Sequence, residues 1–402
     1  MRLAALALVL TALGCAARAQ PTPVLPPLLD DPTVLRVGTS GDYPPFSSLA
    51  PGGERTGFDV AVAEAYGRDR RRRIVFVPFR WPELAARLVA GDFDVAMSGI
   101  TVRPERLVLG TMTAAVARTE AVLVVRPGST DLRAGEGLRV GVNRGGHLER
   151  VARAHLPRTT LVLVDDNRTL GNLLAAGTVD AVVTDTLELA TFTAPFRVAA
   201  RLSQDRKAYW VRPGGEDLAR DLDEWLRERE RDGTLQALRD RQLGRTLRPT
   251  LAPELARLVD LVARRLMIMP LVAAAKRAAN LPVDDPARER EVERMATARA
   301  GASRFPVEDY LDLVRAERTA AKTIQRASAD DAEPPPPLAE LRMALDRLDT
   351  AIDDALRDAA PADVPRERIA SALRADADVP GLSDRLLDEI ARCLRRLLAN
   401  DA

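Results

Sequence analysis

Histidine, cysteine and aromatic residues are scarce in this chain of 402 residues, and the first two shortages exclude whole classes of site. Aromatic residues make up 4% of the sequence, and the only two histidines are His147 and His155. Two histidines argue against a His-rich metal site and against a Ser-His-Asp triad. A glycine loop with the spacing that binds phosphate is also missing. We therefore expect neither a metal nor an organic cofactor.

An excess of either charge is also missing. Lys and Arg number 59 and Asp and Glu number 58, which gives a net charge of +1. This balance provides no attraction of the whole molecule to nucleic acid or to an anionic membrane, so we expect neither as a partner. The length exceeds what one hydrophobic core usually serves, which predicts two domains.

The first twenty residues resemble an export signal, and their apolar run is too short to span a bilayer. Arg2 supplies the positive end, Leu3–Leu13 the apolar stretch, and Ala17-Arg18-Ala19 a small-x-small cleavage site. We predict a signal peptide over residues 1–19 that is cleaved after Ala19. The mature protein is then periplasmic, with no membrane span.

An alternative for the same segment uses Gly14-Cys15 as a lipoprotein junction, with a lipid anchor on Cys15. Ala12 is a poor residue at the start of such a motif, which favours ordinary cleavage. Only Cys393 then remains, and this excludes an intramolecular disulfide. Cys393 could still pair between two chains, so a homodimer stays open.

Short β-rich runs alternate with helical stretches from Leu35 to about Gly244, which predicts an α/β sandwich with a largely parallel sheet. The continuous apolar character of "DAVVTD" is typical of a strand covered on both faces. Helices are expected at Trp81–Ala90, Leu148–Leu156 and Thr169–Ala176. The expected strands are Leu35–Gly38, Ile74–Pro78, Val95–Ser98, Ala121–Val125, Leu138–Asn143, Thr160–Val164, Ala181–Thr184 and Ala208–Val211.

The pattern changes after Gly244, because the segments from Leu251 onward have helical spacing and none is a convincing strand. The segment "LARLVDLVARRL" places Leu255, Leu258 and Leu266 among apolar positions three to four residues apart. An all-α domain over residues 251–400 therefore follows an α/β domain over residues 33–245. The boundary is expected at residues 245–252, where Arg248-Pro249 interrupts the helix.

Four segments of the first half, "LRVGTSGDYPPFSS", "GFDVAVAEA", "FRWPELAARLVAGDFDVAMSGITVRPER" and "GTVDAVVTD", resemble the bacterial periplasmic amino-acid-binding proteins over about 210 residues. A closer resemblance, to the periplasmic cyclohexadienyl dehydratases, rests on "TSGDYPPFS", "VNRGGHLERVARAHL", "VDDNRTL", "VTDTLE" and "RKAYWV". The resemblance implies two α/β lobes with a ligand between them. It also implies the elimination of water and carbon dioxide from prephenate or arogenate.

That elimination needs a cation to hold a carboxylate and an acid to protonate the departing hydroxyl group. Arg106 matches the family arginine that binds a ligand carboxylate, and Ser98 and Thr101 could add hydroxyl donors. Glu188 matches the general acid, which works at neutral pH only if burial raises its pKa. As alternatives, Arg106 is a surface ion-pair partner and Glu188 is a charge at a helix N-terminus.

Three further residues match positions around the family cleft. Asp185 matches the position where plain binding proteins hold an amino group, and Tyr43 and Asn143 match lining residues. Tyr43 could instead simply pack, and Asn143 could cap a turn. The usual aromatic residue and lysine are missing from "GTMTAAVARTEAV", where Arg118 is the only nearby cation. The partner of the substrate's second charge is therefore unassigned.

The second half places cations at helical offsets. Arg265 and Lys276 are eleven residues apart, about three helical turns, so both face one side, although Pro270 between them can kink the helix. Asp285 and Arg288 are three residues apart at the expected start of the next helix. The segments "RRLMIMPLVAAAKRAANLPVDDPAREREVERM", "AERTAAKTIQ" and "PPPPLAELRMALD" resemble the exported (gamma) class of all-helical chorismate mutases over about 150 residues.

This resemblance implies three arginines for the carboxylates of chorismate, an ammonium and an amide that donate to its ether oxygen, and an orienting aspartate. In this order the residues are Arg265, Arg288, Arg342, Lys276, Gln325 and Asp285. Holding the carboxylates removes the cost of orientation, and the donors stabilise the charge that grows on the oxygen. Because an amide donates at any pH, the activity should not collapse between about pH 5 and 8.

Two neighbouring reactions on one exported chain predict a bifunctional enzyme of phenylalanine biosynthesis. The second half rearranges chorismate to prephenate, and the first converts prephenate or arogenate to phenylpyruvate or phenylalanine. The alternative is a solute-binding module for an amino acid or aromatic acid, fused to an active mutase. Glu188 discriminates between them, because a plain binding protein needs no second acid three residues beyond Asp185.

Overall fold

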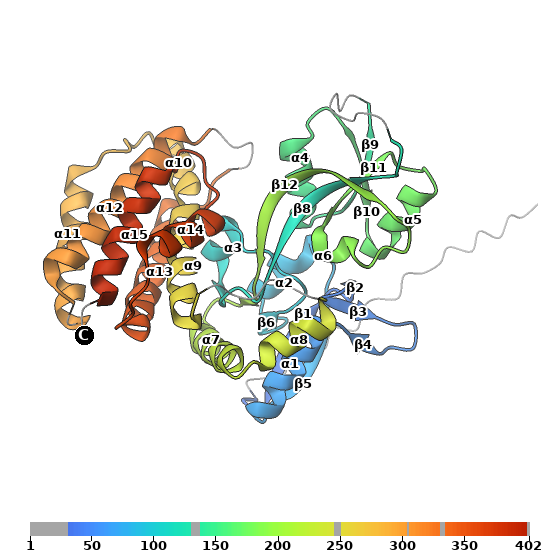
Figure 1. Ribbon diagram of the computed structural model, residues 1–402, viewed down its shortest axis with the longest axis horizontal. Coiled ribbons are helices and arrows are strands. Elements are labelled where there is room, and N and C mark those ends of the chain that lie inside the picture. Colours follow the sequence, from blue (N-terminus) through green and yellow to red (C-terminus); the bar gives the residue numbers. More distant parts are fainter. Residues whose placement is uncertain (1–30, 130–136, 245–250, 304, 330–333, 400–402) are drawn as a thin grey trace, which may run out of the picture. The chain divides into compact units, whose positions relative to one another are not determined.

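The computed structural model describes residues 31–129, 137–244, 251–303, 305–329 and 334–399, which Figure 1 draws in colour. From Thr33 onward the chain forms one compact unit. The predicted signal peptide, its cleavage site and Cys15 lie outside the described residues, as do residues 245–250 of the expected domain boundary. None of the helices in the described ranges combines the length and apolar character that crossing a membrane requires.

The first lobe is built around a sheet with the strand order β5-β1-β6-β13-β7. Strand β1 lies parallel to β5 and β6, whereas β13 runs antiparallel to β6 and β7. The strands are β1 (Val34–Thr39), β5 (Arg73–Pro78), β6 (Val95–Ala96), β7 (Thr111–Met112) and β13 (Trp210–Val211). The other elements are β2 (Asp42–Tyr43), β3 (Ser47–Leu49), β4 (Arg55–Thr56), α1 (Phe58–Asp69), the 3-10 helix η1 (Trp81–Glu83), α2 (Leu84–Val89) and α3 (Pro104–Leu109).

The second lobe has a sheet with the strand order β10-β9-β11-β8-β12. Strands β10, β9 and β11 are parallel, while β8 is antiparallel to both β11 and β12. The strands are β8 (Ala117–Val125), β9 (Arg139–Asn143), β10 (Thr160–Val164), β11 (Ala181–Asp185) and β12 (Arg197–Lys207). The helices are α4 (His147–His155), the 3-10 helix η3 (Asn167–Thr169), α5 (Leu170–Ala175) and α6 (Thr186–Leu189).

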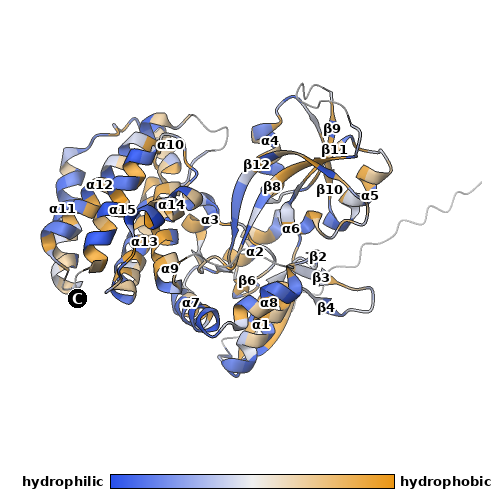
Figure 2. Ribbon diagram, viewed as in Figure 1, coloured by the Kyte–Doolittle hydropathy of each residue, from blue (hydrophilic) through white to orange (hydrophobic). Residues whose placement is uncertain are grey.

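The two-lobed α/β class is confirmed, but both sheets are mixed and not largely parallel. The difference arises from β12, which the sequence does not predict, because charged residues interrupt its apolar alternation. The expected strand Ala208–Val211 is also shortened to β13, since residues 208 and 209 connect β12 to it. Figure 2 shows mainly hydrophobic residues along β9 and β11, as expected for strands covered on both faces.

The chain crosses between the lobes twice. It leaves β7 through residues 113–116 to enter β8, and it returns from β12 through residues 208–209 to β13. Helices α7 (Glu216–Arg231) and α8 (Thr234–Gln242) then pack on the first lobe, where α7 contacts β7 and β13 and α8 contacts α1. Lys207 is the last residue of β12, so its side chain lies at the return crossing.

The described residues from Leu251 onward form helices and no strand, which confirms the all-α second part. Pro270 lies in the first turn of a new helix, so the expected long helix is divided after Met267. Leu258, Ile324 and Leu394 are fully buried in the core of this bundle. The helices are α9 (Pro253–Met267), α10 (Met269–Ala278), α11 (Pro286–Ser303), α12 (Val307–Ala327), α13 (Leu338–Ala359), α14 (Arg366–Asp376) and α15 (Asp384–Ala399).

Cys393 belongs to this helical core. Its side chain lies in α15 and packs among buried apolar residues, with 5% of the residue exposed. A disulfide between two chains would therefore require α15 to move away from its neighbours.

Buried arginines join the helical part to the lobes at the two crossings. Arg264 of α9 donates hydrogen bonds to the backbone carbonyls of Met112 (2.7 Å) and Thr113 (2.6 Å) at the first crossing. Arg206 of β12, beside the return crossing, forms a buried ion pair with Asp260 of α9. A buried charge is costly without its partner, so each part supplies groups that the other requires.

Candidate functional site

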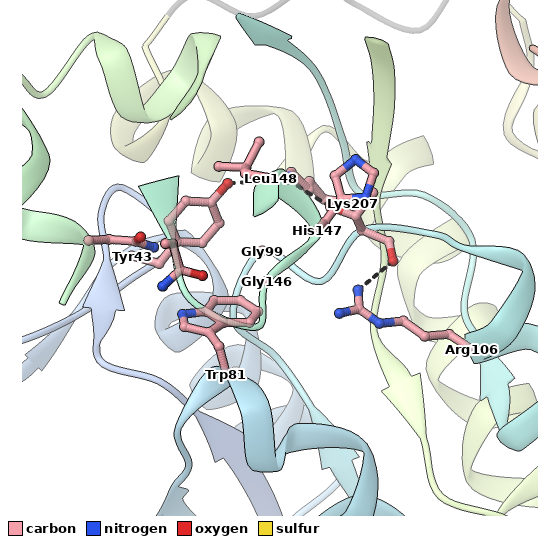
Figure 3. Close-up of a pocket in the computed structure, with 11 residues that line it drawn as sticks. Tyr43, Trp81, Gly99, Arg106, Gly146, His147, Leu148 and Lys207 are labelled. Carbon is pink, nitrogen blue, oxygen red and sulfur yellow. Dashed lines mark hydrogen bonds between the residues drawn. The ribbon is translucent and has the colours of Figure 1, made fainter. Parts of the chain in front are cut away.

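A cleft with about 290 Å³ of empty space lies between the lobes (Figure 3). It lies near the carboxyl ends of β9 and β11, which is where α/β sheets are expected to bind ligands. Both lobes and the return crossing contribute to its lining, which consists of Tyr43, Trp81, Gly99, Thr101, Arg106, Asn143, Gly146, His147, Leu148, Asn167 and Lys207.

Four buried polar side chains form a network that connects the lobes across this cleft. The Lys207 ammonium lies 3.3 Å from the Asp185 carboxylate and donates hydrogen bonds to the hydroxyl groups of Thr101 (2.9 Å) and Tyr43 (3.2 Å). Tyr43 in turn donates to Asp185. Gly99 has a φ of +63°, and a Cβ atom there would lie 2.6 Å from the Tyr43 ring, so glycine lets this tyrosine reach the cleft.

Asp185 uses both of its carboxylate oxygens within the protein. One accepts hydrogen bonds from the backbone N–H groups of Leu187 and Glu188 (2.9 Å each) and caps α6. The other accepts from Tyr43 and lies beside Lys207. The position that matches the amino-group anchor of binding proteins is therefore already neutralised.

Glu188 is a buried acid in α6 and is 1% exposed. The Thr184 hydroxyl donates to its Oε2, and its Oε1 has no partner among the described residues. Burial and, after it, the charge of Asp185 raise the pKa of Glu188 well above its usual value, against the opposing hydrogen bond from Thr184. Glu188 therefore favours its protonated form more strongly than an exposed glutamate does, although it does not line the cleft as the lobes stand here.

Arg106 is a buried cation in α3, 7% exposed, and it makes no ion pair with any described residue. It donates to the backbone carbonyl of Thr101 (2.7 Å), and its guanidinium lies over the Trp210 ring, 5.4 Å from the centroid. Burial and then Arg103 lower the pKa of Arg106 to about 9, so it stays charged at neutral pH. The surface ion-pair alternative does not describe this residue.

Asn143 ends β9 and lines the cleft, and its side-chain Nδ2 has no partner among the described residues. A Cβ atom on Gly146 would lie 2.3 Å from the Asn143 Oδ1, so this position needs glycine. Ser98 differs from the other expected residues. Its buried hydroxyl hydrogen-bonds to those of Ser40 (2.9 Å) and Ser47 (2.6 Å), and it does not line the cleft.

Sequence reasoning missed Lys207 as a cation of the cleft. The residue stands in "RKAYWV", one of the segments that carry the dehydratase resemblance, but after a strand that the sequence does not predict. Arg118, the only nearby cation expected from the sequence, instead pairs with Asp376 of α14 (Nη2 to Oδ2, 3.0 Å). Lys207 lies far along the chain from Arg106 and Arg118, so a search for a nearby cation in the sequence could not find it.

A second and larger cavity, with about 1060 Å³ of empty space, lies within the helical part. It is lined by every residue that the mutase resemblance implies, namely Arg265, Lys276, Asp285, Arg288, Gln325 and Arg342. Three further cations, Arg299, Arg318 and Lys322, line the same cavity and were not expected. The division between α9 and α10 therefore does not separate Arg265 from Lys276.

The cations of this cavity differ in whether the protein already provides them with a partner. Arg288 and Arg342 make no side-chain ion pair with any described residue. Lys276 donates to the backbone carbonyl of Val283 (2.9 Å), and burial, as the largest cause, lowers its pKa. Asp285 accepts a hydrogen bond from the backbone N–H of Arg288 (3.0 Å) at the start of α11, so its carboxylate orients this turn.

Gln325 and Arg265 differ in whether their polar groups already have partners within the protein. The buried Oε1 of Gln325 has no partner among the described residues, and its Nε2 lies 3.7 Å from the Met269 sulfur. Arg265 is already paired, with Asp349 at 2.7 Å and Glu317 at 3.4 Å. Burial raises the pKa of Glu317 to about 7, against the opposing charge of Arg265.

Two family models match the chain, one in the lobed part and one in the helical part. Residues 35–245 match the bacterial extracellular solute-binding proteins, family 3, and residues 256–326 match chorismate mutase type II. The cyclohexadienyl dehydratase of Pseudomonas aeruginosa is 32% identical over 224 residues, which covers 50% of this chain and 80% of that protein. The L-cystine-binding protein of Escherichia coli is 27% identical over 222 residues, which covers 52% of this chain and 82% of that protein.

Solved structures show the same fold for the first half. An ancestral arginine-binding protein bound to arginine has 25% sequence identity and a TM-score of 0.50, over 53% of this chain and 99% of that chain. An arginine-binding protein of T. maritima, solved as a mutant, also has 25% identity and a TM-score of 0.50, over 53% of this chain and 96% of that chain.

Proposed function

Because the chain belongs to family 3 of the bacterial extracellular solute-binding proteins and carries a type II chorismate mutase domain after that region, we propose that it is a bifunctional exported enzyme. Its helical domain is an isomerase that rearranges chorismate to prephenate. Its lobed domain is a dehydratase that converts prephenate to phenylpyruvate, with arogenate and phenylalanine as the alternative pair. The product of the first reaction is the substrate of the second.

The occupied Asp185 carboxylate is the observation that supports dehydration over amino-acid capture. A bound amino acid presents an ammonium group, which needs an acceptor such as a free carboxylate. No carboxylate lines the cleft among the described residues, and Asp185 is taken by Lys207, Tyr43 and two backbone amides. Two cations line the cleft, Arg106 without an ion-pair partner among the described residues and Lys207 paired with Asp185, and this positive lining suits a ligand that carries carboxylates.

The dehydratase step in this proposal uses Glu188 as the general acid. The ring hydroxyl leaves with the proton of Glu188 and becomes water. The bond between the ring and its carboxylate breaks at the same time, carbon dioxide departs, and the released electron pair makes the ring aromatic. Arg106, Lys207 and Asn143 hold the substrate so that its hydroxyl group faces the acid.

The mutase step needs no nucleophile in this proposal. Arg288 and Arg342, whose charges have no protein partner among the described residues, bind the carboxylates of chorismate. Arg265 supports them, and Lys276 and Gln325 donate to the ether oxygen as its bond breaks. Asp285 orients Arg288 through the turn that it caps. The mutase reaction then depends on Gln325 at any pH, because an amide does not titrate.

One experiment tests both steps. Purified mature protein is given chorismate, and chorismate, prephenate and phenylpyruvate are followed by chromatography. We expect phenylpyruvate from the unmodified protein, prephenate alone from Glu188→Gln, and unreacted chorismate from Arg288→Ala. The Arg288→Ala protein still converts added prephenate, which makes the two variants controls for each other. Prephenate accumulation by the unmodified protein would remove the dehydratase from the proposal.

Amino-acid capture is the second candidate, and the L-cystine-binding and arginine-binding relatives favour it. In this case the lobed domain only binds a solute, while the helical domain remains an active mutase. Calorimetric titration with cystine, arginine and phenylalanine tests it. Tight binding of one amino acid per chain, together with no turnover of prephenate, would decide for capture.

We also propose residues 1–19 as a signal peptide that is cleaved after Ala19, followed by a dehydratase domain over 33–245 and a mutase domain over 251–400 in the periplasm. The family of extracellular binding proteins supports export. The intact mass of the protein recovered from the periplasm tests the cleavage site. A mass that includes a lipid on Cys15 would establish the lipoprotein alternative.

A further inference from the structure

His147 is a polar residue of the cleft to which the proposed reaction gives no role. It is the first residue of α4, and it lines the cleft together with Lys207 and Arg106 (Figure 3). Its Nε2 lies 2.9 Å from the Oδ1 of Asp205, a buried residue of β12. The Ser203 hydroxyl donates to the same oxygen (3.0 Å), so the carboxylate that orients the imidazole is itself held in place.

The second nitrogen of the ring is available for a ligand. The Nδ1 of His147 is buried and has no hydrogen-bond partner among the described residues. Buried polar atoms in proteins are nearly always paired, so an unpaired one beside a cleft indicates a contact made with the ligand. Asp205 fixes the Nε2 side of the ring, and this leaves Nδ1 as the ring nitrogen that can still take a partner.

The charges of the cleft call for one more positive group. Prephenate brings two carboxylates, but Lys207 is already paired with Asp185, which leaves Arg106 as the cation of the cleft without an ion-pair partner among the described residues. The charged groups that act on His147 are Asp205 and Lys207 from β12 and Arg103 from the segment before α3. If the imidazole took up a proton, the resulting positive charge would lie between the carboxylates of Asp205 and of the ligand.

We propose that His147 is a carboxylate-binding residue of the cleft that takes up one proton when a dicarboxylate ligand binds. This inference rests on the proposed function for the identity of the ligand. The free imidazole is neutral near pH 7, because burial lowers the pKa of His147 against the opposing charge of Asp205. The carboxylate of the ligand then supplies the second negative neighbour that stabilises the imidazolium. The bound form has Nε2–H donating to Asp205 and Nδ1–H donating to the ligand.

Calorimetric titration with prephenate measures this proton directly. The background is the double variant Glu188→Gln and Arg342→Ala, which stops turnover in the cleft and weakens binding of prephenate in the mutase cavity. In titrations at about pH 7.5, the observed enthalpies in phosphate and in Tris differ by the number of protons taken up multiplied by the difference between the ionisation enthalpies of the two buffers. We expect about one proton per bound prephenate in this background.

Adding His147→Gln to the background should remove the proton uptake and weaken prephenate binding by about ten- to a hundredfold, as for a lost hydrogen bond to a charged group. Glutamine keeps a polar side chain of similar reach but cannot be protonated. Asp205→Asn is the second variant, and it should reduce the uptake with the histidine intact. Melting temperatures show whether each variant folds.

The outcomes separate this inference from the proposed function. Proton uptake that survives in both His147→Gln and Asp205→Asn would overturn the role of His147, and so would a failure of the background variant to bind prephenate. The protein could instead bind prephenate with proton uptake and yet produce no phenylpyruvate. The dehydratase proposal would then fail, while His147 would remain a ligand contact.

Discussion

Glu188 and Arg106 are both buried, and burial disfavours the charged form of each, which moves their pKa values in opposite directions. Burial, followed by the charge of Asp185, raises the pKa of Glu188, which favours the protonated form that the proposed elimination needs. Burial, followed by Arg103, lowers the pKa of Arg106 to about 9, which still leaves it charged near pH 7. One environment thus provides a proton donor and a cation together.

The proposed dehydratase step should depend on pH, because in this proposal the protonated form of Glu188 is the active one. The rate constant for prephenate should stay level through neutral pH and fall about tenfold per pH unit above the raised pKa of Glu188. The mutase rate of the same protein, measured with chorismate, should stay level between about pH 5 and 8, because the Gln325 amide does not titrate. A dehydratase rate that rises with pH through neutrality would contradict this assignment.

Glu317 should make the stability of the protein depend on pH. Its pKa is raised from 4.5 to about 7 by burial, so the folded state favours the protonated form. Its contribution is fully present below about pH 4.5 and is lost as the pH rises to about 7, by on the order of 3 kcal/mol. Glu317→Gln should remove this loss.

Thermal unfolding of the unmodified protein and of Glu317→Gln at about pH 5 and about pH 7.5 measures the difference. Other groups titrate in both proteins, so the comparison between them isolates Glu317. An equal change in melting temperature in both would mean that this carboxyl group is not perturbed.

At the scale of helices and strands, the sequence predicts those elements whose residue pattern is periodic and whose contacts are close along the chain. Thr160–Val164 has the predicted bounds, and the apolar spacing of α9 is recovered, because both patterns are local. Strand β12 escapes prediction, since its charged residues serve partners far along the chain, such as Asp185 and Asp260. Helical offsets place Arg265 with Lys276 and Asp285 with Arg288, but only the resemblance brings Gln325 and Arg342 to the same cavity. Lys207 reaches the cleft only through the long return of the chain.

The turn between β9 and α4 gives a prediction at this scale. Gly146→Ala would place a Cβ atom 2.3 Å from the Asn143 Oδ1, so Asn143 must move. We expect kcat/KM for prephenate to fall by about a hundredfold, as for a misplacement of about 1 Å in a site, with the mutase rate unchanged. Gly52→Ala is the matched control, because nothing lies within 4 Å of its Cβ position. An equal loss in both variants would point to a general effect on folding.

For the whole molecule, the two halves depend on each other through buried charges. Arg206 and Arg264 are 5% and 1% exposed at the side chain, and both are paired with Asp260. Arg118 lies directly opposite Arg206 across β8 and β12, and Asp376 lies near both. Like charges facing each other across two strands are unfavourable unless carboxylates compensate them, and α9 and α14 supply these carboxylates.

Asp260→Ala should therefore uncouple the halves. It leaves two buried guanidinium groups without their main carboxylate, at a cost of about 3–5 kcal/mol. We expect scanning calorimetry to show two separate transitions in place of one. Asp358→Ala is the control, because it removes a more exposed carboxylate, which pairs with Arg227 at 2.5 Å and lies 3.8 Å from Arg257, and it should cost less than about 1 kcal/mol. Similar traces for the two variants would refute the dependence.

Consecutive side chains of a strand point to opposite faces, and the adjacent residues Arg206 and Lys207 use this alternation to serve the mutase domain and the cleft at once. In evolutionary terms, we expect the contact with the mutase domain to constrain the position of Arg206 and the cleft to constrain that of Lys207. Relatives that lack a mutase domain should vary at the position of Arg206 but keep the cation at that of Lys207. An alignment of fused and unfused relatives tests this, and a cation equally frequent at the Arg206 position in both groups would contradict it.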